Sequence, residues 1–268
     1  MSAAASAQGD DAAAYYVYGV VARGDGADAF DGVVGLDQAH EILLIEGRDV
    51  AAVASEVTLG EFGDDVLTSN LRDPLWLEEK VRAHDRVLAA AVERVTVVPF
   101  RFGTIYRSLD HVRKMLDERA DLERTLERLR GAVELGVKGF LSRDAVRDRL
   151  AAEHGLDGEK PASGREYMLR RSLERDLDDA VQRLAAELAD DNHERLTGAA
   201  EAAIANPVRA ADEHPEERMF LNGAYLVRVD REDGFRAAVA SLDSTDARYE
   251  VTGPWPAYNF AEPSEDDA

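Results

Sequence analysis

Two kinds of segment alternate along this chain: short runs of β-branched and aromatic residues, and longer amphipathic stretches. Runs such as Tyr15–Val21 and Met219–Val227 have the composition of β-strands. The stretch from Arg165 to Ala189 instead carries leucine or valine every three or four residues, which is the spacing of a buried helix face. Strands interleaved with helices of this kind predict an α+β protein.

The first part of the chain is predicted to form one α+β domain over residues 15–130. Strand-like runs occur at residues 15–21, 42–45, 50–53 and 95–103. Gly47–Asp49 separates the second and third runs and is predicted to be a hairpin turn. A helix is predicted from Asp73, because the proline that follows it is favoured in the first helical turn. Another helix is predicted from Ser108 to about residue 130.

Residues 131–268 are predicted to form a second domain with long helices. Strands are expected at 131–141, 219–227 and 248–252, and helices from Asp144, over 165–189 and over 235–242. A Gly-, Pro- and charge-rich stretch at 155–164 is expected to be a loop. A weak strand between Leu196 and Ala205 would complete the βαββαβ order of a ferredoxin-like domain.

The N-terminal residues 1–14 are rich in Ala, Ser, Gly and Asp. They lack the basic start and the apolar core of a signal peptide, so we expect a disordered tail. No run approaches 18 consecutive apolar residues, so no transmembrane helix is predicted. We therefore expect a soluble, cytoplasmic protein.

The segment Gly253–Phe260 combines three aromatic residues with two prolines. Proline fixes φ and donates no backbone hydrogen bond, so this segment is expected to be extended and outside any helix. Trp and Tyr offer large contact areas with polar tips. We predict that Trp255, Tyr258 and Phe260 pack either in a groove of their own domain or on another protein.

Two further apolar features allow the same two interpretations. Phe100 and Phe102 lie on one face of the predicted strand at 95–103, because side chains two apart in a strand share a face. That face is either core or a second partner contact. The apolar stripe of the 165–189 helix is likewise either core or a face for a partner helix.

Acidic residues outnumber basic ones by 54 to 32, and only four of the basic residues are lysines. A net charge of −22 repels phosphate groups, so binding to nucleic acid or to an anionic membrane is not expected. Carboxylate excess with few lysines is typical of cytoplasmic proteins of extreme halophiles, in which salt screens the self-repulsion. The alternative is an acidic protein of a mesophile.

Catalytic and metal-binding patterns are missing from the sequence. There is no cysteine, and the six histidines are scattered without a His-x-x-x-His pair. Gly24–Gly26 matches only half of a dinucleotide-binding fingerprint. His84 is expected to pack in the apolar face of its helix, and Asp190–His193 to frame a solvated helix end. We expect no enzyme activity, cofactor or metal; a ferredoxin-like small-molecule sensor or cation-dependent enzyme is the alternative.

Seven short motifs occur in the order in which one protein family has them. They are Tyr16–Val20, Trp76-Leu77 with His84, Val98–Thr104, Gly131 with Glu134 and Gly136–Lys138, Gly164–Arg171, Asn222–Val227 and Gly253–Phe260. On these residues the chain resembles the GvpF/GvpL family of gas vesicle accessory proteins. Met168 stands where that family usually has leucine.

The resemblance implies an N-terminal α+β domain and a modified ferredoxin-like C-terminal domain. It also implies a non-enzymatic role in assembling gas vesicles, the gas-filled protein shells that make microbes buoyant. Its implied partners are the small hydrophobic shell protein and other accessory proteins, and its implied location is the cytoplasm, in association with gas vesicles. The acidic composition suggests a haloarchaeal member, and the length a GvpL-like one. Whether the chain remains in the mature shell as a minor component is left open.

Overall fold

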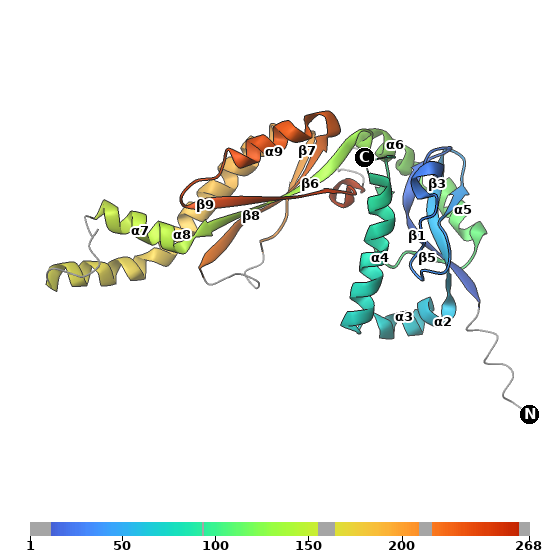
Figure 1. Cartoon of the computed structure of the whole chain (residues 1–268), viewed down its shortest axis with the longest axis horizontal. Helices are drawn as coiled ribbons and strands as arrows, with labels where there is room; N and C mark the ends of the chain where they lie inside the picture. The colour runs from blue at the N-terminus through green and yellow to red at the C-terminus, as the bar shows by residue number, and fades with distance from the viewer. Residues whose placement is uncertain (1–11, 93, 155–163, 209–215, 263–268) are drawn as a thin grey trace, which may run out of the picture. The chain divides into compact units, whose positions relative to one another are not determined.

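The structure is a computed structural model that describes residues 12–92, 94–154, 164–208 and 216–262 (Figure 1). The chain divides into two compact units. The first contains the residues up to Val133 and those from Pro254 onward, and the second is Glu134–Gly253. The sequence predicts the boundary at residue 130, close to this division. It also predicts that the C-terminal segment is part of the second domain, whereas the structure groups that segment with the first unit.

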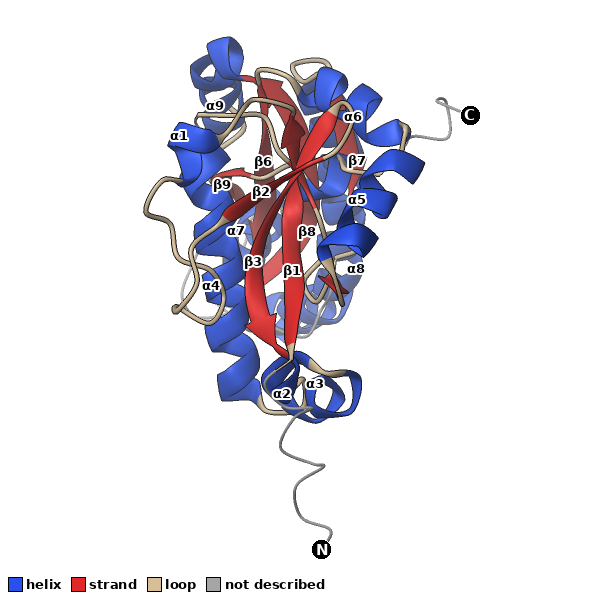
Figure 2. Cartoon of the chain, turned by 90° about the vertical axis from the view of Figure 1, so that its right-hand side faces the viewer, coloured by secondary structure: helices blue, strands red, loops and turns tan. Residues whose placement is uncertain are grey.

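The first unit is built on a sheet with the strand order β2-β3-β1-β4, in which β5 also pairs with β1. Figure 2 shows β2, β3 and β1 of this sheet. Its strands are β1 (Ala13–Ala22), β2 (Leu43–Glu46), β3 (Val50–Thr58), β4 (Val98–Pro99) and β5 (Ile105–Tyr106). All the pairs are antiparallel. The backbone of β4 passes so close to Gly19 that a Cβ atom there would lie 2.5 Å from the Val98 carbonyl oxygen. Glycine is therefore required at this crossing.

Two expectations for these strands need correction. The predicted tail at 1–14 is too long by two residues, because Ala13 and Ala14 already pair with β3; residues 1–11 lie outside the described part. The predicted strand at 95–103 is reduced to Val98–Pro99. The chain turns at Gly103, where φ is +90°, and re-enters the sheet as β5. Positive φ suits glycine, which has no Cβ to clash.

Six α-helices are described in the first unit. They are α1 (Ala27–Phe30), α2 (Leu59–Phe62), α3 (Asp64–Asn70), α4 (Pro74–Val92), α5 (Leu109–Glu118) and α6 (Asp121–Leu129). The start of α4 confirms the prediction, since Asp73 Oδ1 accepts the N–H of Leu75 at 3.0 Å. The single helix predicted from Ser108 is wrong: it breaks at Arg119, whose φ and ψ of −99° and 69° are not helical.

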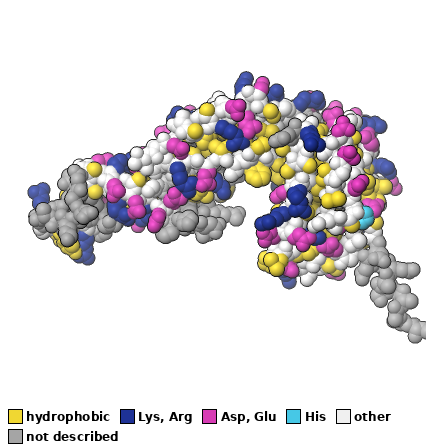
Figure 3. Space-filling view, viewed as in Figure 1, with side chains coloured by type: hydrophobic (Ala, Val, Ile, Leu, Met, Phe, Trp, Pro, Cys, Tyr) yellow, Lys and Arg dark blue, Asp and Glu magenta, His cyan; other side chains and the backbone are white. Residues whose placement is uncertain are grey.

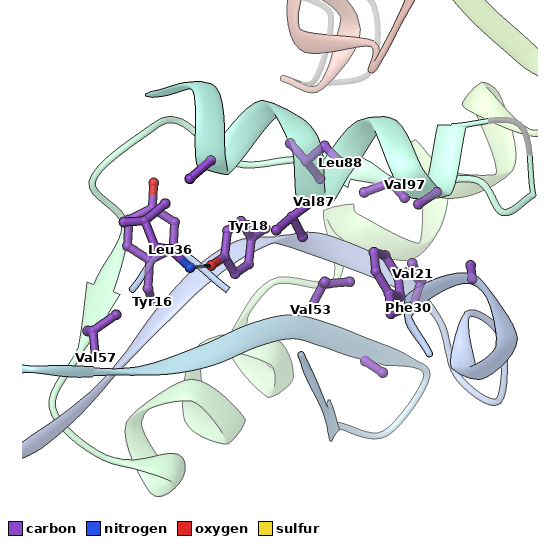
Figure 4. Packing of buried hydrophobic residues seen from close by; sticks show 14 of the residues in the cluster. Tyr16, Tyr18, Val21, Phe30, Leu36, Val53, Val57, Val87, Leu88 and Val97 are labelled. Atoms are coloured by element: carbon purple, nitrogen blue, oxygen red, sulfur yellow. Dashed lines mark hydrogen bonds between the residues drawn. The ribbon is translucent and has the colours of Figure 1, made fainter. Parts of the chain in front are cut away.

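The core of the first unit lies between the sheet and α4. Tyrosine and aliphatic side chains pack together there, and Figure 4 shows how Tyr18 points into this cluster beside Val87 and Leu88. The Tyr18 hydroxyl accepts the N–H of Leu36 at 2.7 Å and lies 2.9 Å from Ser55 Oγ. A buried hydroxyl needs such partners, so the polar atoms of this core are satisfied inside the unit.

The second unit has a four-stranded sheet with the order β7-β8-β6-β9. Its strands are β6 (Ala132–Ser142), β7 (Ala202–Ala205), β8 (Glu217–Arg228) and β9 (Ala247–Trp255), and its helices α7 (Arg143–Glu153), α8 (Gly164–Thr197) and α9 (Glu232–Ala240). The weak strand predicted before Ala205 is β7, which pairs antiparallel with β8. The order of elements is βαββαβ with a second helix in the first connection, as expected for a modified ferredoxin-like unit.

The apolar stripe of α8 contributes to the core of the second unit. Leu177, Val181 and Ala185 are buried against strand residues such as Leu135 and Tyr225. The interpretation of this stripe as core is therefore confirmed for the middle of the helix. The predicted loop at 155–164 lies outside the described residues except for Gly164, which begins α8.

Candidate functional site

The C-terminal segment folds as two pieces rather than as one extended strip. Strand β9 continues through Pro254 to Trp255, as the prolines predicted. Residues Tyr258–Phe260 then form a 3-10 turn, which the sequence analysis had excluded. Prolines lack an N–H group, but their carbonyl oxygens still accept: the N–H of Tyr258 donates to Pro256 O at 2.7 Å. The turn begins at that bond and carries the Tyr258 side chain into the first unit.

The C-terminal segment binds to His84 of α4 through Tyr258. This histidine is only 2% exposed, and both ring nitrogens have partners. Its Nδ1 lies 2.9 Å from the Tyr16 hydroxyl and its Nε2 lies 2.8 Å from the Tyr258 hydroxyl. The imidazole also stacks on Tyr18 at 5.5 Å and meets Phe102 edge-on at 5.9 Å. We call Tyr16, Tyr18, His84, Phe102 and Tyr258 the aromatic–histidine cluster.

The hydrogen bonds of this cluster fix the proton on one ring nitrogen. Neutral histidine has one N–H donor and one acceptor nitrogen. The Tyr258 hydroxyl donates its proton to the Asp85 carboxylate, so it accepts from His84 Nε2. We therefore assign the ring proton to Nε2. His84 Nδ1 then accepts the proton of the Tyr16 hydroxyl, which itself accepts the N–H of Gly103 at 3.0 Å.

Burial keeps the cluster neutral near pH 7. Loss of solvation lowers the pKa of His84 to about 4, and it raises the pKa of Tyr18 to about 12. Burial also raises the pKa of Tyr16, against the opposing effect of the Gly103 hydrogen bond. The pKa values of His84, Tyr16 and Tyr18 are thus shifted away from neutral pH, whereas a general acid or base has a pKa near it. The arrangement suits a structural lock that fastens the C-terminal segment.

A second set of contacts holds the end of the segment. Phe260 is 3% exposed and therefore lies inside the first unit. Arg128 Nη2 of α6 donates to the carbonyl oxygens of Phe260 at 2.8 Å and Glu262 at 3.1 Å. Arg101 pairs with the Glu262 carboxylate at 2.5 Å, on the exposed side. A planar guanidinium that binds two carbonyls fixes the direction in which the chain leaves the unit.

The five residues predicted as partner contacts thus have different environments. Tyr258 and Phe102 both pack against His84 in the aromatic–histidine cluster. Phe260, two residues after Tyr258, is buried. Phe100 is half-buried, and its N–H donates to Tyr18 O at 2.8 Å. Trp255 is 47% exposed, the most of the five. It is the one whose ring offers substantial surface to another molecule.

Sequence reasoning missed two of the tyrosines. Tyr16 and Tyr18 read only as strand residues, although their spacing of two places both on the face that meets α4. The signal that could have identified them is the combination of a Tyr-x-Tyr strand with a histidine on an apolar helix face. Neither pattern is informative by itself, because the two segments lie 68 residues apart.

The interpretation of Asp190–His193 as a solvated helix end is wrong. Helix α8 continues to Thr197, so these residues lie within it. Asn192 is buried, and its Nδ2 donates to the Tyr249 hydroxyl at 2.7 Å. His193 Nδ1 lies 2.8 Å from the Tyr225 hydroxyl. Both side chains bind α8 to the sheet of the second unit.

The loop that resembled half of a dinucleotide fingerprint borders an open cavity of about 450 Å³. Gly24, Gly26, Asp28 and Arg94 are among the residues that line it. Within the described ranges, no three His, Cys, Asp or Glu side chains are grouped in a way that could hold a metal ion. In the same ranges, no helix combines the length and the apolarity needed to cross a membrane.

The fold and the site define a class: α+β proteins in which a ferredoxin-like unit is inserted before a C-terminal segment that returns to the N-terminal unit. The family model described as "Gas vesicle synthesis protein GvpL/GvpF" matches residues 14–262. The chain therefore belongs to the GvpL/GvpF family, as its motifs indicated.

Individual relatives agree with this assignment. The chain is 34% identical over 254 residues to gas vesicle protein L of Streptomyces sp. (strain CB03234), with 94% of both chains covered. It is 25% identical over 256 residues to gas vesicle protein F1 of Halobacterium salinarum, with 92% of both covered. The crystal structure of GvpF from Anabaena sp. PCC7120 has the same fold, with a TM-score of 0.68 at 18% identity over 94% of this chain and 98% of that one.

These relatives carry both L and F names and come from Streptomyces, Halobacterium and Anabaena. The expectations of a haloarchaeal source and of a GvpL-like member therefore stay predictions. The α+β fold class is confirmed by the structural match.

Proposed function

We propose that this protein acts in the assembly of gas vesicles as a non-enzymatic accessory protein in the cytoplasm. In this proposal it binds the hydrophobic shell protein and other accessory proteins. Membership of the GvpL/GvpF family over residues 14–262 is the observation that carries the proposal. The alignments with the named gas vesicle proteins cover nearly the whole length of both chains, so the similarity is not limited to one shared domain.

A physical argument supports binding rather than catalysis. A shell protein that presents an apolar face to gas exposes that face to water before assembly, and large exposed apolar patches cause aggregation. A highly charged partner can cover the face and stay in solution itself, since net charge favours solubility. With 54 acidic and 32 basic residues, this chain has that character.

The exposed ring of Trp255 is the contact that we propose within the C-terminal segment. Tyr258 and Phe260 are occupied inside the first unit, so their substitution would disturb folding as well as binding. Trp255 differs from them, because it is 47% exposed. Tryptophan is also among the residue types that contribute most to binding when an interface forms.

The test is genetic complementation in a vesicle-forming host from which the gene and any paralogue have been deleted. We expect no vesicles in the deletion strain and normal vesicles after return of the natural gene, by flotation and electron microscopy. Trp255→Ala should lower vesicle yield while leaving the thermal unfolding curve of the purified protein nearly unchanged. Val229→Ala changes another exposed apolar side chain and serves as the matched control.

Normal vesicles in the deletion strain would overturn the proposed role. Normal vesicles with Trp255→Ala would overturn only the proposed contact. Thermal unfolding with added nucleotides or divalent cations tests the alternative of a small-molecule sensor or cation-dependent enzyme. A large stabilisation by either would favour that alternative, because a ligand that binds only the folded state raises the melting temperature.

A further inference from the structure

The turn between α3 and α4 places apolar side chains in water. Val66, Leu71 and Leu75 are all exposed and lie within ten residues of sequence, and Leu75 is 77% exposed. Figure 3 shows apolar side chains at the surface where α4 begins, with charged side chains beside them. We call these three residues the α3–α4 corner. Single exposed leucines are ordinary, whereas several exposed apolar side chains at one turn make that turn a candidate contact surface.

The corner rests on a fixed support. The N–H of Leu71 donates to Leu67 O at 2.9 Å, and Asn70 Nδ2 donates to Glu61 O at 3.1 Å. Trp76 Nε1 donates to the Glu61 carboxylate at 2.8 Å. Lys80 is almost fully buried and lies 3.0 Å from the same carboxylate. Because the backbone at this turn is held by these bonds, little entropy is lost when a partner binds.

Acidic side chains dominate the surroundings of the corner. Residues 64–79 contain five acidic residues and one basic residue, Arg72. Asp64 is paired with Arg107, and Glu78 with Arg82. All five carboxylates lie on exposed residues, so they form a negative rim to the apolar group. Such a rim attracts a positively charged partner and repels a negatively charged one.

The rim also decides against a second copy of this chain as the occupant. A second copy would bring the same carboxylates to the contact, together with a net charge of −22. Like charges brought together at an interface cost free energy, and the carboxylates here outnumber the neighbouring basic residues Arg72, Arg82 and Arg107. The apolar group and its rim are complementary instead to an apolar face flanked by lysine or arginine.

We propose that the α3–α4 corner is a docking site for a basic amphipathic segment of another protein. Leucine or a similar apolar side chain of that segment would cover Leu75, and its flanking cations would face the acidic rim. The corner is a different surface from Trp255, and the inference does not depend on a role in gas vesicles.

The test measures binding of two labelled helical peptides to the full chain by fluorescence anisotropy. Both peptides carry the same leucine face; one has lysines on its flanks, and the other has glutamates at those positions. At low salt we expect the lysine peptide to bind at least about tenfold more tightly, because the rim distinguishes the flanks. Leu75→Ser should weaken its binding by about tenfold, as loss of a central apolar contact does. Val229→Ser is the matched control.

Charge reversal and added salt distinguish the contribution of the acidic rim from that of the apolar side chains. Asp65→Lys combined with Glu78→Lys should reduce or invert the preference for the lysine peptide. In 1 M NaCl, where the Debye length is about 3 Å, that preference should shrink while the dependence on Leu75 persists. Each variant is first checked for an unchanged melting temperature.

Three results would overturn the proposal. Equal binding of both peptides at low salt would show that the rim has no part. Binding unaffected by Leu75→Ser would place the peptide elsewhere. Self-association of the natural chain that Leu75→Ser abolishes, measured by sedimentation, would assign the corner to a second copy.

Discussion

Both units contain a tyrosine–histidine hydrogen bond to a long helix, but the two tyrosines come from different parts of the chain. In each unit a tyrosine hydroxyl bonds to a histidine of a long helix: Tyr258 of the C-terminal turn to His84 of α4, and Tyr225 of β8 to His193 of α8. In the second unit the partners are 32 residues apart in one continuous segment. In the first they are 174 residues apart, and the tyrosine comes from the opposite end of the chain.

This difference shows that the first unit depends on a segment that its own part of the sequence does not contain. The second unit is one continuous stretch, Glu134–Gly253, and has its own core. Without the C-terminal segment, the first unit lacks the partner of His84 Nε2 and the buried ring of Phe260. Its stability should therefore respond to changes at the C-terminus, while that of the second unit should not.

Removal of residues 254–268 should have the largest effect. Loss of a buried phenylalanine costs about 3–5 kcal/mol, and a buried nitrogen without a partner costs about 1–3 kcal/mol more. We expect the first unit to lose about 5 kcal/mol of stability, which is a large part of what a domain has. Amide hydrogen exchange should show faster exchange in β1 and unchanged exchange in β8.

The control for this truncation is removal of residues 263–268, which leaves Phe260 and Glu262 in place. Equal loss of protection in β1 and β8 after the longer truncation would contradict the proposed independence of the two units.

Acid should destabilise the first unit through His84. Its folded pKa of about 4 lies below the usual value near 6.5, so the unfolded chain binds the extra proton first. Stability is therefore lost as the pH falls from about 6.5 to 4, by about 3 kcal/mol at ~1.4 kcal/mol per pKa unit. The measurement is the unfolding free energy of the natural chain minus that of His84→Gln across this range. If this difference in unfolding free energy did not change with pH, the prediction would be contradicted. The surface carboxylates are the same in both proteins, so their contributions cancel.

Removal of one hydroxyl group from each unit compares the two tyrosine–histidine pairs directly. Tyr258→Phe leaves the Nε2 of fully buried His84 without its partner, so we expect a loss of about 1–3 kcal/mol. Tyr225→Phe should cost about 1 kcal/mol, because half-buried His193 can bind water instead. Unit-resolved hydrogen exchange provides the measurement. A larger loss from Tyr225→Phe would reverse the ranking of the two pairs.

The smallest expected effect concerns two arginines that bind carbonyl groups near the C-terminus. Arg128 donates to Phe260 O in the first unit, and Arg236 donates to Gly253 O at 3.0 Å in the second. Alanine at either position should cost about 0.5–1 kcal/mol, because both arginines are partly exposed and water can replace the lost donor. Each loss should be confined to its own unit in chemical denaturation followed by local probes. Arg101→Ala, which breaks an exposed ion pair, should cost less than 1 kcal/mol.

Local signals in the sequence predicted most of the elements. Asp73-Pro74 located the start of α4, and even the alanine-rich β7 was expected because the fold required it. The break between α5 and α6 was missed, because Arg119 is a good helix former whose side chain instead pairs with Asp121. Helix propensity alone cannot reveal a side-chain ion pair of this kind.

The site was harder to predict than the fold. The aromatic segment was recognised as a docking element, yet it was assigned to the neighbouring domain because neighbours in sequence usually fold together. Its real partner, His84, was described correctly as a packed residue. Only the three-dimensional structure joins the two, since nothing local to Tyr258 indicates a histidine 174 residues earlier.

The discontinuous first unit has a consequence for the order of folding during synthesis. Domains usually fold from the N-terminus as the ribosome makes them. Here the second unit, 120 residues long, can fold as soon as it emerges, whereas the first must wait for Tyr258 and Phe260. At about 5–20 residues per second, that wait lasts on the order of 6–24 s. The unit encoded first is thus completed last, and a prematurely terminated chain is left with its N-terminal unit unlocked.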